Sequence, residues 1–252
     1  MKTIKFILLL VAPIVSFSQN AGLERIEQDL LSVYNKLFSF YHRHDSDSLQ
    51  KYSEQLRNRT IELLSKNPQT LAHPFSVLID SNAFEIVTSD DGFFRIYSWD
   101  TWTGGTMHFY DIIYQFSNKG KVYTEPVNLE EGDCGAFYSA IYALKTATKT
   151  YYLAVSNAGF SSKDKAQSVE VFSIENDQLK LVKLIKSQNG FTDRINVEYD
   201  FFTVVDRPER PPALIRYDKN KKIFYIPVVY EDGKVTDKFI QYKFNGKYFE
   251  KI

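Results

Sequence analysis

The spacing of apolar residues changes once along the chain, after Asp80, and this change limits the architectures open to it. Before this point apolar side chains recur every three or four residues, as in helices, and after it they alternate with polar ones, as in strands with one wet face. Turn dipeptides such as Asp91-Gly92, Lys119-Gly120 and Asn245-Gly246 then recur about every fourteen residues. The pattern predicts a large antiparallel up-and-down β-meander.

The segment before this change predicts a helical hairpin. Residues 23–41 place their apolar side chains on one helical stripe, and residues 49–64 form a second stripe. Asp47, with Gln50 three residues later, resembles a capping box at the start of the second helix, and Asn67-Pro68 ends it. The short connection lets both stripes face a common partner, so we expect the hairpin to dock on the β-meander.

These patterns divide the chain into three parts. Residues 1–18 form a leader, residues 19–80 form the helical hairpin with a further short helix over 70–80, and residues 81–252 form the β-meander domain. Aromatic residues, which favour strands, make up 15% of the chain. The expected fold class is therefore α+β, mostly β.

The expected strands group in fours into three units, residues 84–129, 134–187 and 192–251. Three units suit a propeller poorly, because a closed propeller needs about four blades or more and three would leave edges exposed. The strands of the meander can instead curl into a barrel or stack as two sheets. We expect a barrel or a two-sheet sandwich rather than a propeller-like arrangement.

The leader has the features of a secretory signal peptide. Lys2 and Lys5 precede an apolar run from Phe6 to Val15, and the small residues Ser16 and Ser18 favour cleavage before Gln19. The run is too short for a membrane-spanning helix, and no cysteine follows it that could carry a lipid. We expect an exported, soluble protein, periplasmic or extracellular, with no membrane span in the mature chain.

The charge balance argues against nucleic acid as a partner. The chain has 31 basic and 31 acidic residues and no basic stripe to bind phosphates. The G-x-G-x-x-G, GxxxxGK[ST], HExxH and G-x-S-x-G patterns do not occur, so no cofactor and no catalytic motif is expected. No metal is expected either, because His42-x-His44 lies in the interhelical turn, where solvated polar residues are usual.

Cys134 is the single cysteine, and we interpret it as a small buried side chain. A thiol nucleophile needs a histidine that activates it, and all four histidines precede Cys134 in the chain. His108 could still reach it in the fold. A hydrolase that uses Cys134, or carboxylates dispersed along the sequence, is therefore the alternative function.

The strongest candidate site is Trp99-Asp100-Thr101-Trp102. Both tryptophans of the protein lie here, beside a carboxylate and a hydroxyl and close to a turn, where an aromatic platform could meet a sugar or a peptide. The other interpretation is that the indoles close one end of the core.

The wider segment Ser89–Thr106 reads SDDGFFRIYSWDTWTGGT. It resembles a hairpin shared by uncharacterised exported bacterial proteins of similar length. The resemblance is local and brings no function or catalytic residues with it. The sequence thus favours an exported binding or structural module, with a glycan or a protein as the expected partner, over an enzyme.

Overall fold

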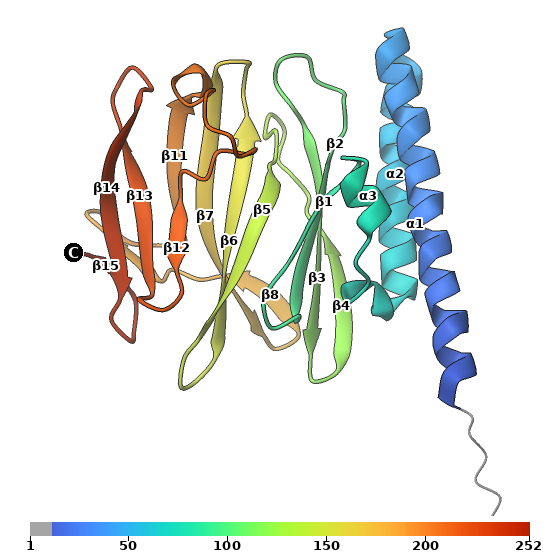
Figure 1. Ribbon diagram of the computed structural model, residues 1–252, viewed down its shortest axis with the longest axis horizontal. Coiled ribbons are helices and arrows are strands. Elements are labelled where there is room, and N and C mark those ends of the chain that lie inside the picture. Colours follow the sequence, from blue (N-terminus) through green and yellow to red (C-terminus); the bar gives the residue numbers. More distant parts are fainter. Residues whose placement is uncertain (1–11) are drawn as a thin grey trace, which may run out of the picture.

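The computed structural model describes the backbone of residues 12–252 and the side chains from residue 21 onward. Most of the expected signal peptide, residues 1–11, lies outside the described residues. The described chain arranges a helical hairpin and three sheets side by side, with the helices at one end and the C-terminal strands at the other (Figure 1). Among residues 12–252, every helix is too short or too polar to cross a membrane.

The helical hairpin is confirmed. It consists of α1 (Ala12–Arg43) and α2 (Ser46–Lys66), followed by the 3-10 turn η1 (Pro68–Leu71) and the short α3 (Ser76–Asp80). The expected cap, Asp47, is wrong by two residues. Because α2 begins at Ser46, Asp45 stands in the cap position and its carboxylate accepts the Ser48 amide at 3.1 Å.

The strands form three open sheets. The helix-side sheet runs in the order β1 (Glu85–Thr88), β2 (Phe94–Asp100), β3 (Tyr110–Asn118), β4 (Lys121–Pro126). The middle sheet contains β5 (Phe137–Lys145), β6 (Thr150–Gly159), β7 (Asp164–Glu175), β8 (Gln178–Leu181) and β11 (Arg194–Asp200). The C-terminal sheet contains β9 (Ile185–Ser187), β10 (Gly190–Thr192), β12 (Arg216–Asp218), β13 (Ile223–Val229), β14 (Val235–Phe244) and β15 (Phe249–Lys251).

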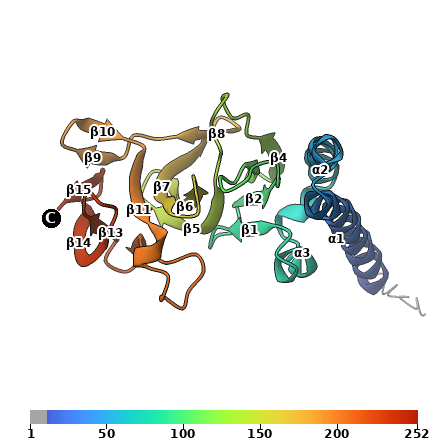
Figure 2. The same ribbon diagram turned by 90° about the horizontal axis from the view of Figure 1, so that it is seen from above.

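The predicted mostly β, antiparallel meander is confirmed, and its packing is that of a sandwich. Within the described part of the chain none of the sheets closes into a barrel, and Figure 2 shows them as successive layers. There are three layers of strands rather than two. They follow the three units expected from the sequence, except that β9 leaves the second unit for the C-terminal sheet and β11 leaves the third unit for the middle sheet.

A separate apolar cluster fills each interface between layers. Leu37, Leu56 and Tyr97 belong to the cluster between the hairpin and the helix-side sheet. Phe94 and Phe172 belong to the cluster between the helix-side and middle sheets. Each fully buried side chain of this size contributes about 1.5–3 kcal/mol to folding, so the hairpin adds substantial burial to the sheet that it covers.

Buried polar contacts hold the helical segments to one another and to the helix-side sheet. The Glu27 carboxylate of α1 accepts the backbone amides of Val77 and Leu78 at 2.7 and 3.1 Å, where α3 begins. From the sheet, the buried Arg95 guanidinium donates to the carbonyls of Thr70 and His73. These contacts tie α1 to α3 and β2 to the segment between α2 and α3, and a shift of these segments would leave buried charges without partners.

Candidate functional site

The first expected site residue, Trp99, lies in the core. Its side chain is 1% exposed, faces the helical hairpin and packs against Phe84 with ring centroids 4.6 Å apart. Its indole Nε1 has no hydrogen-bond partner within the described structure. A side chain in this place closes the core and cannot present a platform to a ligand in solvent.

The other three residues hold the end of the β2–β3 hairpin. Trp102 is half-buried against Tyr41 of α1, and its indole donates to the Tyr34 hydroxyl at 3.1 Å. Asp100 accepts the Trp102 amide at 2.8 Å through one oxygen, while its other oxygen lies 2.5 Å from His108 Nδ1. The Thr101 hydroxyl donates to a backbone carbonyl at 3.0 Å. Ligand binding here stays a prediction, with Trp102 as the one indole near the surface.

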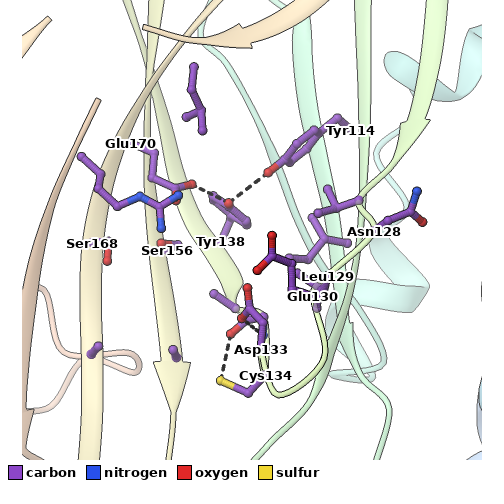
Figure 3. Close-up of a pocket in the computed structure, with 18 of the residues that line it drawn as sticks. Tyr114, Asn128, Leu129, Glu130, Asp133, Cys134, Tyr138, Ser156, Ser168 and Glu170 are labelled. Carbon is purple, nitrogen blue, oxygen red and sulfur yellow. Dashed lines mark hydrogen bonds and ion pairs between the residues drawn. The ribbon is translucent and has the colours of Figure 1, made fainter. Parts of the chain in front are cut away.

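A cavity lies away from these residues, between the helix-side and middle sheets (Figure 3). The cavity measures about 850 Å³. One wall comes from β3, β4 and the segment 127–136, which we name the wall loop, and the other wall comes from β5, β6, β7, β8 and β11. None of the four expected site residues lines it.

The cavity exists because side chains become small along the strands of the middle sheet. Two packed sheets stand about 10 Å apart and need large side chains to fill the space between them. At one end of the interface Tyr152 and Phe172 supply that volume. Further along the same face of β6 and β7, Ser156 and Ala166 take the corresponding positions. These side chains leave the end of the interface near the wall loop hollow.

A row of polar side chains crosses the floor of the cavity. Strand register places Tyr138, Ser156, Ser168 and Asn196 directly opposite one another on four neighbouring strands. Ser168 donates to the Asn196 side-chain oxygen at 2.7 Å. Ser156 is 5% exposed and lines the cavity, and its hydroxyl opens into the cavity without a hydrogen bond to a described residue. A hydroxyl placed in this way is available to a ligand or to water.

Glu170 of β7 is the buried charged group in the cavity wall formed by the middle sheet. It is 6% exposed, accepts the Tyr138 hydroxyl at 2.6 Å and pairs with Arg194 at 2.7 Å. The Tyr114 hydroxyl of the facing sheet lies 3.2 Å from that of Tyr138 and donates to it, since the Tyr138 proton points at Glu170 (Figure 3).

The environment of Glu170 sets its protonation. Burial raises the pKa of its carboxyl above the ordinary 4.5, and the charges of Asp133 and Asp193 act in the same direction. The Tyr138 hydrogen bond and Arg194 oppose that rise in pKa. The charge of the buried Glu170 carboxyl thus depends on its neighbours, chiefly Tyr138 and Arg194.

Three more carboxylates line the opposite side. Glu125 of β4 is half-buried, and burial raises its pKa. Glu130 and Asp133 of the wall loop are exposed, and Asp133 accepts the Gly135 amide at 2.9 Å. Four carboxylates and a single guanidinium, that of Arg194, line the cavity, so its field is negative.

The wall loop is held in place from two sides. At Gly135, with φ +67°, an added Cβ would lie 2.9 Å from the Tyr110 carbonyl oxygen, so a larger residue would push the loop outward. From the hairpin, Arg57 donates to the Val127 carbonyl at 2.8 Å and pairs with Asp111 at 2.5 Å. A helix that never touches the cavity therefore positions one of its walls.

Cys134 lines the cavity but is not an activated thiol. It is 5% exposed, and its thiol lies 3.4 Å from the Gly135 carbonyl. Burial and the neighbouring Asp133 charge raise the thiol pKa, the opposite of what a nucleophile needs. His108, the histidine that could have activated it, is held by Asp100 through Nδ1. This agrees with the interpretation of Cys134 as a small buried side chain.

No three side chains of the metal-ligating types come together within the described residues. Comparison of the chain with models of known protein families gave no match, and neither did a search of curated proteins. The protein is therefore described by its fold and its cavity alone. It is a layered α+β protein with a negatively charged cavity between two of its three sheets.

Reasoning from the sequence missed this site because its residues are scattered. Ser156, Glu170 and Arg194 lie on three strands and meet only through strand register. One local signal was present. Along the inward face of β6 and β7, Ser and Ala occupy positions where an interior face normally carries large apolar residues. When two neighbouring strands carry such small residues at the same end, a hollow is expected there.

Proposed function

We propose that this protein is an exported binding module, and that its ligand, a glycan or a peptide, enters the cavity between the helix-side and middle sheets. The Ser156 hydroxyl, which opens into the cavity beside the buried Glu170 carboxylate, carries the proposal. Buried polar groups are normally satisfied, so an open hydroxyl on a cavity floor suits a ligand. The volume of about 850 Å³ falls within the range of about 300–1,000 Å³ of known ligand sites.

Obstructing the cavity tests the proposal. Ala158 lines the cavity on β6, and Ala158→Phe would place a benzyl group inside it, whereas Ala147→Phe places the same side chain in an exposed turn. Cell-wall glycan fragments and pooled short peptides are screened for a rise in melting temperature of the unmodified mature protein. A ligand of the cavity raises it in the mature protein and in Ala147→Phe but not in Ala158→Phe. An equal rise in all three proteins would contradict the proposal.

A hydrolase is the second candidate. Glu170 has a raised pKa and feels the charge of Asp133, and two carboxylates in unlike environments are the usual acid and base of glycoside hydrolysis. The Arg194 ion pair weighs against this role, since it favours the ionised form of the acid. Chromatography of ligands incubated with the protein separates the two functions. Cleavage that stops in Glu170→Gln while the ligand stays bound would favour the hydrolase.

Export is part of the proposal and has its own test. The basic start, the apolar run and the small residues before Gln19 support it. Mass spectrometry of the protein recovered from its natural source should find a mature chain that begins at Gln19. A chain that keeps residues 1–18 would contradict export by this route.

A further inference from the structure

The cavity between the helix-side and middle sheets has a polar, acidic interior and an apolar mouth. Leu129 of the wall loop, Phe160 after β6 and Leu181 of β8 line it, and each of these large side chains is 37–45% exposed. Apolar side chains that stand in solvent around a cavity are available to cover an apolar part of a ligand. The interior carries Glu170 and the half-buried Glu125.

Arg194 shows which kind of group the interior accepts. Its guanidinium pairs with Glu170 at 2.7 Å, yet its side chain is 51% exposed, while the Glu170 side chain is 8% exposed. Arg194 is therefore a half-exposed cation paired with a buried anion. A cation supplied by a ligand could take its place without leaving Glu170 unpaired, because the Arg194 head group can turn into water.

The remaining carboxylates extend this preference. Glu125, Glu130 and Asp133 form no ion pair with any described basic side chain, in contrast to Glu170. An anionic ligand would meet uncompensated repulsion from them, and a neutral ligand would gain nothing from their charge. A ligand with an ammonium or guanidinium group is attracted by all of them.

We infer that the cavity binds a peptide segment that carries a lysine or arginine side chain next to apolar residues. The inference rests on the proposed function and names its ligand class. The cationic group lies against Glu170 on the polar floor, where the Ser156 hydroxyl accepts a hydrogen bond from it, and the apolar neighbours pack at the mouth. A peptide fits better than a sugar because two of the three mouth residues, Leu129 and Leu181, are aliphatic, whereas sugars stack on flat aromatic faces.

Calorimetric titration of the full mature chain with capped tripeptides tests this. The probes are acetyl-Leu-Lys-Leu-amide, its counterparts with uncharged norleucine or anionic glutamate as the middle residue, and the cationic glucosamine trimer. The lysine peptide should bind at least about tenfold more tightly than the norleucine peptide, and the glutamate peptide should bind most weakly.

Three variants locate the preference. Glu170→Gln should remove most of the advantage of the lysine peptide, and Arg194→Gln should increase it, because the ligand then no longer competes with an internal cation. Glu231→Gln, in an exposed turn outside the cavity, should change nothing. If Glu170→Gln folds poorly, Glu125→Gln carries the same test, with a smaller loss of that advantage expected.

Several outcomes would overturn the inference. Equal affinity for the lysine and norleucine peptides would exclude a role for the cation, and tighter binding of the glucosamine trimer would exclude the peptide. Failure of every probe would refute the inference about the ligand. The proposed function would still stand if some other compound stabilised the mature protein but not Ala158→Phe.

Discussion

Truncation of Trp99 should be far more damaging than truncation of Trp102, although the two residues lie in one short segment. Trp99 is 1% exposed and packs on Phe84, so Trp99→Ala leaves a large cavity between the hairpin and the helix-side sheet. Such truncations cost about 3–5 kcal/mol. In a protein of this size each kcal/mol lowers the melting temperature by about 2–4 °C, so a fall of roughly 6–20 °C is expected.

Trp99→Phe separates packing from hydrogen bonding. The change removes the indole Nε1, which is buried without a partner and costs about 1–3 kcal/mol in the native protein. Removal of this cost offsets part of the stability lost with the smaller side chain. The melting temperature of Trp99→Phe should therefore be much closer to that of the native protein than the melting temperature of Trp99→Ala is. Trp102→Ala loses the hydrogen bond to Tyr34 and the tilted ring contact with Tyr41, worth about 1–3 kcal/mol together.

Calorimetry gives the melting temperatures, and iodide quenching of a Trp102→Phe protein reports on Trp99 alone. Trp99 emission should be protected from iodide. A melting temperature of Trp99→Ala within about 2 °C of the native value, or ready quenching of Trp99 by iodide, would refute the placement of this side chain in the core.

Three more predictions follow from the cavity walls. Arg57→Ala should speed amide hydrogen exchange in the wall loop, residues 127–136, because the loop loses its bond to α2; unchanged exchange there would show that the loop holds itself. Cys134 should react slowly with thiol reagents in the native protein, and Cys134→Ala should cost about 1 kcal/mol; fast labelling at neutral pH would contradict its raised pKa. Glu170 binds its proton more tightly folded than unfolded, so its contribution to stability falls as pH rises from about 4.5 through the raised pKa. Urea unfolding at a series of pH values should show this loss of unfolding free energy in the native protein but not in Glu170→Gln. The same dependence of the unfolding free energy on pH in both proteins would contradict it.

Local patterns predicted the helical hairpin and the antiparallel strands of this protein well. The apolar stripes of residues 23–41 and 49–64 fall within α1 and α2, because a stripe needs only neighbouring residues to define it. The cap shifted from Asp47 to Asp45 because several polar residues at the interhelical turn suit that role. Alternation and turns predicted the meander for the same local reason.

Nonlocal pairing could not be predicted in this way. β15 joins β9 in parallel over a long sequence separation, and this pairing moves residues 185–187 out of the unit expected for them. The burial of Trp99, with Trp102 three residues later nearer the surface, depends on which face of β2 the hairpin covers. The cavity depends on the register that sets Ser156 beside Ser168, information that no single segment carries.

A methyl and indole NMR spectrum recorded during titration with acetyl-Leu-Lys-Leu-amide tests the central claim most directly. If the ligand occupies the cavity between the sheets, the methyl signals of Leu129, Ala158 and Ala166 should shift together, while the Trp102 indole signal stays in place. Shifts at Trp102 without any change at the three methyl groups would place binding at the β2–β3 hairpin and contradict the account.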